Sequence, residues 1–269
     1  MIEAKNITFA YQTLPLVTPV VKDVSLKFEA GKFYSILGPN GCGKTTLLDL
    51  MIGHLKPTSG KVLLNLNGVS HGTDILSIDR RETAKYISLV AQNYSINFPF
   101  TVKEVVMMGR HPYIGRFSNP SKDDIEIVNR VIEQTEIRNF ANRKITDLSG
   151  GERQRCLFAR ALSQDTPLLF LDEAFSNMDI NHTIRLLNLV KKEVKERNRT
   201  VVSVFHDINI AAIWSDELIF MQNGEIVCSG KTDDVMDENI IERVFHVKLR
   251  VEYNPYSNSK LAYFKGYNG

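Results

Sequence analysis

The sequence predicts an α/β protein with a largely parallel sheet and helices on its faces. Two observations carry this prediction. Apolar runs typical of strands alternate with helical periodicity, and a glycine-rich loop joins one such run directly to a helix. With 269 residues, of which 43% are apolar and 24% charged, the chain has the composition of an ordinary globular protein and can bury one substantial core.

The first elements are expected to be antiparallel strands. Residues 2–9 and 20–28 alternate apolar and polar side chains, with turn residues between the two runs. The glycine-rich loop follows them. A further β-rich stretch covers residues 61–66 and 85–91.

A helical region is expected after Gln92, where the character of the sequence changes. From about residue 101 to 162 the apolar residues recur with helical spacing. Ser121 and Asp124 are predicted to be the cap and a first-turn acid of one helix. Its apolar positions are Ile125, Val128, Val131 and Ile132.

Strand patterns return in the last part of the chain. The runs 166–171 and 200–205 are apolar, and a helix is predicted between them over 181–197. The doublet 217–221 and 225–229 is predicted to be a hairpin. Its turn is expected at Gln222-Asn223-Gly224. We therefore expect four segments: an N-terminal part of the core with the β region and the glycine-rich loop (1–94), a helical subdomain (95–162), a C-terminal part of the core (163–250) and a short polar tail (251–269).

Composition excludes several classes of function. Lys and Arg number 33 against 31 Asp and Glu, so there is no broad basic field and we expect no nucleic-acid partner. No apolar run approaches the roughly 18 to 20 residues of a membrane helix, so the chain is not expected to span a membrane. Three scattered cysteines favour a reducing compartment, and the six histidines show no zinc-site spacing.

The glycine-rich loop GPNGCGKTT follows the apolar run 33–37 and precedes a predicted helix. Its glycines let successive N–H groups and the helix N-terminus converge on phosphate oxygens, while Lys44 adds a charge and Thr45 a hydroxyl for Mg²⁺. We therefore expect a nucleoside triphosphate site. The alternative is a glycine turn before a packed helix. The expected phosphate-binding residues are Gly38, Pro39, Asn40, Gly41, Cys42, Gly43, Lys44, Thr45 and Thr46.

Cys42 carries a separate expectation. It lies in this loop near a helix N-terminus, a setting that favours the thiolate, so alkylation there is expected to block nucleotide hydrolysis.

Two carboxylates, Asp172 and Glu173, end the apolar run that begins at Leu168. In a doubly wound sheet the carboxyl end of this strand is expected beside the phosphate loop, where Asp172 can hold Mg²⁺ and Glu173 can polarise an attacking water. The alternative is that the pair forms a helix cap and first-turn acid.

A second anion nest is predicted at a helix start, in the sequence LSGGE. Since one triphosphate already has its cradle, a second nest is best explained if it closes on the nucleotide of another copy of the chain in a two-fold dimer. The segment comprises Leu148, Ser149, Gly150, Gly151 and Glu152.

Taken in this order, the motifs resemble those of the ATP-binding subunit of an ABC transporter. The resemblance runs from Ile2 to about Val247 and implies a P-loop NTPase (RecA-like) core with an antiparallel β subdomain and an inserted α-helical subdomain. It rests on Gly38–Thr46, Gln92, LSGGE at Leu148–Glu152, LFLDE at Leu169–Glu173, SNMD at Ser176–Asp179 and His206.

The resemblance implies roles for residues that would be ambiguous alone. Tyr11 would stack on adenine, Gln92 would report Mg²⁺ and nucleotide state to a membrane partner, Asp179 would contact the opposite subunit, and His206 would contact the γ-phosphate. Taken alone, Tyr11 is equally a core or surface residue and His206 a structural one. The implied cofactors are ATP and Mg²⁺. The implied Mg²⁺ ligands are Thr45, Gln92 and Asp172.

Two positions depart from the family pattern. Glu152 stands where glutamine is commoner, and Ala174 follows Glu173 where proline is usual. Neither change removes a phosphate ligand, so we expect activity to persist and the rate to be the quantity affected.

Two stretches resemble the importers of iron-siderophore, haem and cobalamin complexes: Phe100-Thr101-Val102 with Gly109–Tyr113, and Phe205–Asn209 with Ala211-Ala212. The alternative is that these are generic residues of the insert and the switch helix. The resemblance implies transmembrane permease subunits, an extracytoplasmic substrate-binding protein and a homodimer of ATPase subunits at the cytoplasmic face of the membrane. A soluble non-transport ABC ATPase and an ABC ATPase for another solute are the competing hypotheses.

A surface for the permease is expected on Asn93–Arg116. Aromatic and arginine side chains suit an interface anchor, although plain packing explains any one of them equally well. The side chains expected to be exposed there are Phe98, Phe100, Tyr113 and Ile114.

Overall fold

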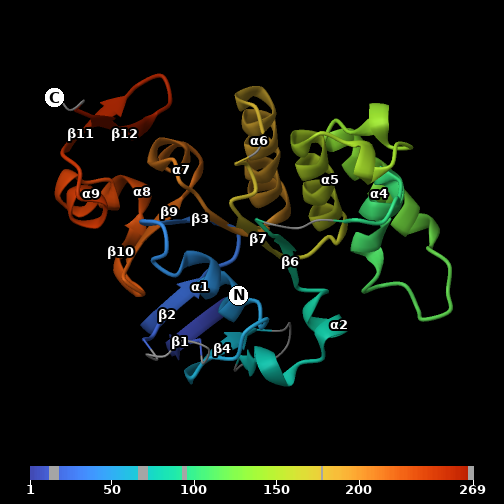
Figure 1. Ribbon diagram of the computed structural model, residues 1–269, viewed down its shortest axis with the longest axis horizontal. Helices are drawn as coiled ribbons and strands as arrows, with labels where there is room; N and C mark the ends of the chain where they lie inside the picture. Colours follow the sequence, from blue (N-terminus) through green and yellow to red (C-terminus); the bar gives the residue numbers. More distant parts are fainter. Residues whose placement is uncertain (12–17, 66–71, 93–95, 177, 266–269) are drawn as a thin grey trace. The chain divides into compact units, whose positions relative to one another are not determined.

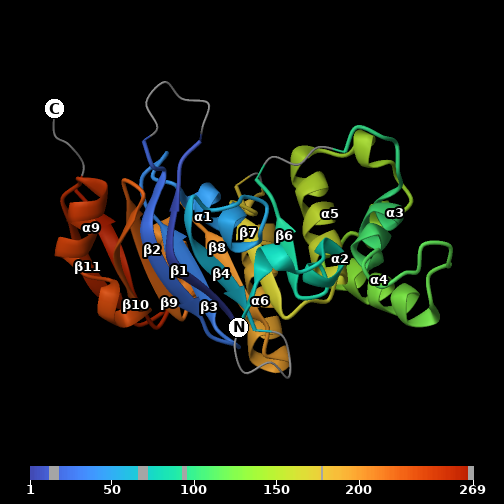
Figure 2. The same ribbon diagram turned by 90° about the horizontal axis from the view of Figure 1, so that it is seen from below.

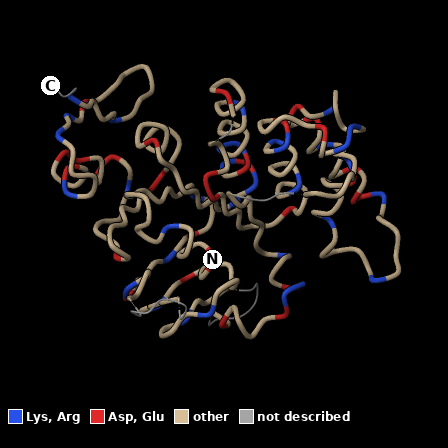
Figure 3. Tube along the Cα trace, viewed as in Figure 1, with Lys and Arg blue, Asp and Glu red and all other residues tan. Residues whose placement is uncertain are grey.

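The computed structural model describes residues 1–11, 18–65, 72–92, 96–176 and 178–265. The chain divides into two compact units, Met1–Ile78 with Val202–Gly269, and Asp79–Val201. Figure 1 labels their helices and strands. Figure 3 shows Lys and Arg interspersed with Asp and Glu along the trace of each unit. Among the helices of these described stretches, none has the length and apolarity needed to cross a bilayer.

In the first unit, an antiparallel sheet has the strand order β2-β1-β4-β5. Strand β1 (Ile2–Phe9) pairs with β2 (Val21–Phe28) on one side and β4 (Ser59–Leu64) on the other, and Figure 2 shows these three side by side. The short β5 (Thr73–Asp74) completes the sheet. The predicted antiparallel pair of strands is confirmed.

A second set of strands in the first unit follows the order β10-β9-β3-β8. Strand β3 (Phe33–Leu37) is buried at all five positions and pairs parallel with β9 (Glu217–Gln222). Strand β10 (Glu225–Lys231) returns antiparallel to β9, as the predicted hairpin requires. Strand β8 (Thr200–Val204) crosses the boundary between the units.

The helices of the first unit follow strand ends. They are α1 (Lys44–Met51) after β3, α7 (Ile208–Trp214) after β8, and α8 (Thr232–Val235) and α9 (Glu238–Phe245) after β10. A 3₁₀ turn, η1 (Ile75–Ser77), follows β5.

Strands β11 (Leu249–Asn254) and β12 (Ser259–Phe264) form an antiparallel pair near the end of the chain. The prediction of a short polar tail from residue 251 is wrong for the described part of that segment. Most side chains of this two-stranded sheet stay partly or fully exposed, so its strands do not show the regular alternation of apolar and polar residues that predicts a strand.

In the second unit, the strand order is β8-β7-β6, and β6 (Ile87–Val90) runs parallel to β7 (Leu168–Asp172). The sequence grouped residues 61–66 and 85–91 as one β-rich stretch, but the strands found in their described parts, β4 and β6, belong to different sheets. The helices here are α2 (Arg80–Thr83), α3 (Val102–Met107), α4 (Lys122–Gln134), α5 (Gly150–Ser163) and α6 (Ile180–Arg197), with 3₁₀ turns η2 (Met108–Arg110), η3 (Arg138–Phe140) and η4 (Ile145–Asp147).

Helix α4 begins as predicted at a Ser121 cap. The Ser121 hydroxyl accepts from the backbone N–H of Asp124, whose carboxylate accepts from the Ser121 N–H in return. Val128, Val131 and Ile132 are buried, but the predicted apolar position Ile125 is 41% exposed. Ile125 lies in the first turn, next to the acidic N-terminus, and the buried stripe starts one turn later.

Two residues of the Gly109–Tyr113 stretch, which resembles metal-chelate importers, have a packing role within the chain. The Arg110 Nε donates to the Asp124 carboxylate at 2.9 Å, and the two side chains are only 7% and 8% exposed. A second guanidinium nitrogen donates to the carbonyl of Ser163 at the end of α5. A Cβ on Gly109 would lie 2.2 Å from the Arg160 carbonyl oxygen, so glycine permits this contact. Gly109 and Arg110 thus join α4 to α5.

Replacing Arg110 by methionine is expected to lower the free energy of unfolding by about 3–5 kcal/mol, because the Asp124 carboxylate would stay buried without its cation. Arg130→Met, on the exposed face of α4, is the matched control and should change stability by less than about 0.5 kcal/mol. Urea unfolding measures both. Equal losses in the two variants would contradict the structural role given to the buried pair.

Candidate functional site

The phosphate loop, Gly38–Thr46, lies between β3 and α1 in the first unit. The Lys44 ammonium donates to the carbonyl oxygens of Gly38 at 2.8 Å and Pro39 at 3.0 Å. Lys44 is only 6% exposed, so its charge is held inside the loop. The loop therefore brings a cation to the N-terminus of α1, an arrangement that suits a polyphosphate.

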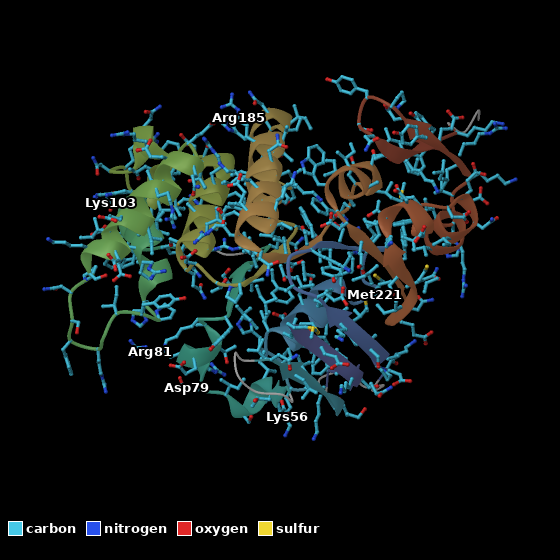
Figure 4. All side chains as sticks on the ribbon, turned by 180° about the vertical axis from the view of Figure 1, so that it is seen from behind. Lys56, Asp79, Arg81, Lys103, Arg185 and Met221 are labelled. Atoms are coloured by element: carbon cyan, nitrogen blue, oxygen red, sulfur yellow. The ribbon has the colours of Figure 1, made fainter. Side chains whose placement is uncertain are left out.

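The loop can take this path only because of its glycines. A Cβ on Gly38 would lie 2.0 Å from the Met221 carbonyl oxygen at the end of β9, a residue labelled in Figure 4. Gly43 has φ +103°, and a Cβ there would lie 2.6 Å from the carbonyl oxygen of Val20. The cradle therefore depends on close backbone contacts that any side chain would prevent.

The turn of the β9–β10 hairpin supports the same loop. The Gly224 N–H donates to the Cys42 carbonyl at 3.1 Å, and the Gly224 carbonyl accepts from the Lys22 N–H at 2.8 Å. A Cβ on Gly224 would lie 2.6 Å from the Val20 carbonyl oxygen. The sequence predicted the turn but not this contact, which joins segments about 180 residues apart.

Tyr11 lies beside the phosphate loop. Its hydroxyl is 3.2 Å from the Thr46 hydroxyl, and its ring meets the Phe9 ring edge-on at a centroid distance of 4.9 Å. The ring stays partly exposed. Stacking of this ring on adenine stays a prediction.

His206 follows β8 in the same unit. The backbone N–H of the residue before it, Phe205, donates to the carbonyl of Ile36 in β3 at 3.2 Å. Since β3 leads directly into Gly38, this bond holds the exposed His206 near the start of the phosphate loop.

In the second unit, the structure brings Gln92 and Glu173 together across 81 residues. The Gln92 side-chain nitrogen donates to the Glu173 carboxylate at 2.5 Å. Asp172, the last residue of β7, is 5% exposed, and Glu173 has φ +49°. Helix α6 does not begin until Ile180 and is capped by Asp179, so the alternative role of Asp172 and Glu173 as a helix cap is wrong.

Gln154 is a residue that the sequence analysis missed. Its side-chain amide is buried and donates to the carbonyl of Ala174 at 3.1 Å, which links helix α5 to the residue after Glu173. Ala174 itself is fully buried. The only sequence signal is that Gln154 lies one turn into the helix that the LSGGE segment opens.

The segment Leu148–Glu152 starts α5 as predicted, with Ser149 as the cap. The Glu152 carboxylate accepts from the N–H and the hydroxyl of Ser149, and these bonds hold the pKa of Glu152 below its usual value. Glutamate at this position is therefore a capping-box residue. A Cβ on Gly150 would meet nothing within 4 Å.

Asp179 caps α6 by accepting from the His182 N–H at 2.9 Å, the main cause of a lowered Asp179 pKa. The His182 ring also lies 4.0 Å from the Glu136 carboxylate, which pairs with Arg185, labelled in Figure 4. The Glu136 carbonyl accepts from Arg155 of α5 at 3.2 Å. Glu136, which the sequence did not single out, thus connects the helix of the signature segment with the helix of Asp179.

The predicted permease surface is described from residue 96 onward, since 93–95 lie outside the described residues. Phe98 is 62% exposed, whereas Phe100 and Ile114 are partly buried, which corrects their expected exposure. Arg81 of α2 donates to the carbonyls of Pro112 and Ile114. The loop is therefore held in place from α2, and permease binding stays a prediction.

The expectation that its setting favours the Cys42 thiolate is wrong, whereas a block of hydrolysis by alkylation stays a prediction. Burial raises the pKa of its thiol, and the nearby Lys44 charge and backbone N–H groups only partly offset this effect. The Cys42 sulfur lies 2.9 Å from the point where a Gly38 Cβ would stand. The helix N-terminus does not outweigh burial here, so Cys42 is a packing residue of the loop.

A protein-family model described as "ABC transporter" matches residues 21–176. A cobalamin import ATP-binding protein of Halobacterium salinarum is 38% identical over 88% of this chain, and the chain spans 58% of that relative's length. The petrobactin import ATP-binding protein YclP of Bacillus subtilis is 32% identical over 94% of this chain and 95% of the relative. The hemin import ATP-binding protein HmuV of Escherichia coli O157:H7 is 36% identical over 97% and 98%.

Solved structures agree with the predicted fold class. A metal-chelate type ABC transporter in an inward-facing conformation matches 99% of this chain and 98% of its own, with a TM-score of 0.81 and 26% identity. A dimeric ATP-binding cassette bound to ADP and Pi in a post-hydrolysis state matches 86% of this chain and 99% of its own, with a TM-score of 0.75 and 29% identity. The ATPase-cassette fold with its P-loop is thereby confirmed.

Iodoacetamide at about pH 7 is expected to modify Cys228, which is partly exposed, before Cys42 and Cys156. Burial raises the pKa of both buried thiols, to about 12 for Cys156, so little thiolate is present at neutral pH. Raising the pH to about 9 should speed labelling of Cys42 because its thiolate fraction increases. Peptide mass spectrometry measures the order, and prior labelling of Cys42 would contradict it.

Proposed function

The chain belongs to the ABC transporter family, and from this premise we propose that it hydrolyses ATP to drive a membrane permease that imports a metal chelate. The observation that carries the proposal is the glycine cradle around the buried Lys44 ammonium. The pairing of Gln92 with Glu173 in the second unit supports it.

Binding of ATP is proposed at the phosphate loop. The cradle fits a polyphosphate because its close backbone contacts exclude side chains and because Lys44 supplies a fixed cation. Mg²⁺, when bound, neutralises charge on the phosphates. Thr45, Gln92 and Asp172 would hold it, since hydroxyl, amide and carboxylate oxygens are the ligands this hard cation prefers.

Activation of water is proposed for Glu173. Its carboxylate accepts a hydrogen bond from the Gln92 side-chain amide, and this bond fixes the position of one carboxylate oxygen. A carboxylate oxygen placed in this way can act as a general base toward water. The proposed role of His206 is contact with the γ-phosphate.

We propose that two copies of the chain close on two ATP molecules, with the signature segment of each copy contacting the nucleotide of the other. Gly150 supports this: it is exposed at the first position of α5, and the open space around it shows that packing within the chain does not require a glycine. A close approach from outside the chain would require one. Asp179 would contact the opposite subunit at the same interface.

The proposed class of cargo, a metal chelate, is based on the names of the relatives. Those reported above have names that specify import of cobalamin, petrobactin and hemin. The proposed partners are transmembrane permease subunits and an extracytoplasmic substrate-binding protein, and the proposed place is the cytoplasmic face of the membrane. The competing hypotheses are a non-transport ATPase and an importer of another solute. A non-transport ATPase would not respond to a permease and its loaded binding protein.

Replacing Lys44 by alanine is expected to weaken ATP binding by about 10- to 100-fold, because hydrogen bonds to a charged group contribute about 1.5–3 kcal/mol. Lys56→Ala is the matched control: Lys56 is exposed in the segment after α1 and should leave affinity unchanged. Fluorescent nucleotide titration measures both affinities. Unchanged binding in the Lys44 variant would contradict the cradle assignment.

The Glu173→Gln variant is expected to lose about 10²- to 10⁴-fold in hydrolysis rate while still binding ATP, because only water activation is removed. It should therefore accumulate as an ATP-bound dimer in gel filtration with Mg²⁺. Glu196→Gln, on the exposed face of α6, should keep the wild-type rate. A fully active Glu173 variant would refute the proposed catalytic role.

A further inference from the structure

The side chain of Asn209 pairs with a backbone peptide group of the C-terminal hairpin, the name used here for β11 and β12. Its nitrogen donates to the Ala262 carbonyl at 3.1 Å, and its oxygen accepts from the Ala262 N–H at 2.7 Å. The amide thereby makes both hydrogen bonds that a neighbouring strand would make with Ala262. These two hydrogen bonds join α7 to the outer edge of β12.

The opposite edge of the hairpin is held by carboxylates of α9. Glu242 accepts from the Leu249 N–H at 3.3 Å, and Glu238 accepts from the Val251 N–H at 2.9 Å. Ala262 is buried. The C-terminal hairpin is therefore hydrogen-bonded to α9 along β11 and to α7 along β12, so that it connects the two helices.

Asn209 is also bonded to the chain next to His206. The Asp207 carboxylate caps α7 by accepting from the N–H groups of Asn209 at 2.8 Å and Ile210 at 3.0 Å. On the other side of His206, the Phe205 N–H is bonded to Ile36 of β3. His206 thus lies between one anchor on the sheet and one on the first turn of α7.

Helix α7 needs such an external contact. It has only seven residues, and isolated helices shorter than about 12–15 residues are marginal in water. Its buried residues are Ile208 and two alanines, Ala211 and Ala212, so only one large side chain of this helix is fully packed into the core. Its position is therefore sensitive to the polar contact at Asn209.

We propose that Asn209 is a positioning residue for hydrolysis: through it, the C-terminal hairpin holds α7 and so fixes the place of His206. The inference rests on the proposed role of His206 in ATP hydrolysis. The sequence predicted only a tail where the C-terminal hairpin lies. The proposal gives this hairpin the function of holding α7 in the first unit. It also explains the asparagine in the Phe205–Asn209 motif.

The proposal separates turnover from binding. Lys44 and Tyr11 are held by contacts with the phosphate loop, and neither of these contacts involves the C-terminal hairpin. Loss of the Asn209 bonds should therefore lower kcat while KM for ATP stays near its wild-type value. A displacement of about 1 Å in a catalytic group can cost up to about 100-fold in rate, so a fall of at least about fivefold is expected.

The test compares Asn209→Leu, Asn209→Asp and Asn239→Leu in the full-length chain. Leucine keeps the volume and removes both bonds, whereas aspartate keeps an acceptor for the Ala262 N–H and should lose less activity. Asn239 is the matched control, because it occupies the same position in α9, where Asp237 accepts from its N–H at 2.9 Å, and is itself exposed. Steady-state ATPase assays give kcat and KM.

Hydrogen–deuterium exchange supplies a second readout that does not depend on hydrolysis. Residues 205–214 should exchange faster in Asn209→Leu than in wild type or Asn239→Leu, with α1 unchanged as a reference for folding. The inference would be overturned if Asn209→Leu kept both the kcat of the wild type and its exchange rate over residues 205–214. A wild-type protein without ATPase activity would instead refute the proposed function, and the exchange comparison would still decide whether the hairpin holds α7. If Asn209→Leu unfolds, Asn209→Asp carries the same comparison.

Discussion

The close backbone packing of the phosphate loop is the constraint on which the first unit depends. The Met221 carbonyl approaches Gly38, and the Val20 carbonyl approaches Gly43, so closely that no Cβ fits at either glycine. The Gly224 N–H also bonds the loop at the Cys42 carbonyl. These contacts bring the end of β9 and the start of β2 against a loop that must remain side-chain-free to receive phosphates. Strands β2 and β9 therefore hold the phosphate loop in a backbone conformation that only glycine allows at these two positions.

In the second unit, side-chain hydrogen bonds connect the start of helix α5 with the residues that follow β7. Helix α5 begins at the signature segment and, one turn later, Gln154 bonds the carbonyl of Ala174 beside Glu173. Glu136 joins the same helix to α6 through Arg185 and His182. These contacts connect the signature segment with Ala174, the residue after Glu173, and with the helix that Asp179 caps.

The errors of the sequence analysis share a physical cause. Cys42 was assigned by its distance along the chain from a helix N-terminus, but burial by segments remote in sequence raises the pKa of its thiol. The hairpin β11–β12 was overlooked because its two strands bury few side chains and are held instead by Asn209, Glu238 and Glu242. In both cases the deciding interactions involve residues that no local pattern connects.

The sequence by itself determined the first antiparallel strand pair, the phosphate loop, the capping of α4 and α5, and the family, because each depends on a local pattern or on a fixed spacing. The pairing of Gln92 with Glu173, the role of Gly224 and the link from Asn209 to Ala262 were decided only by the tertiary structure. These contacts span between 53 and about 180 residues, and hydrogen bonds between side-chain amides and backbone groups leave no periodic signature in the sequence.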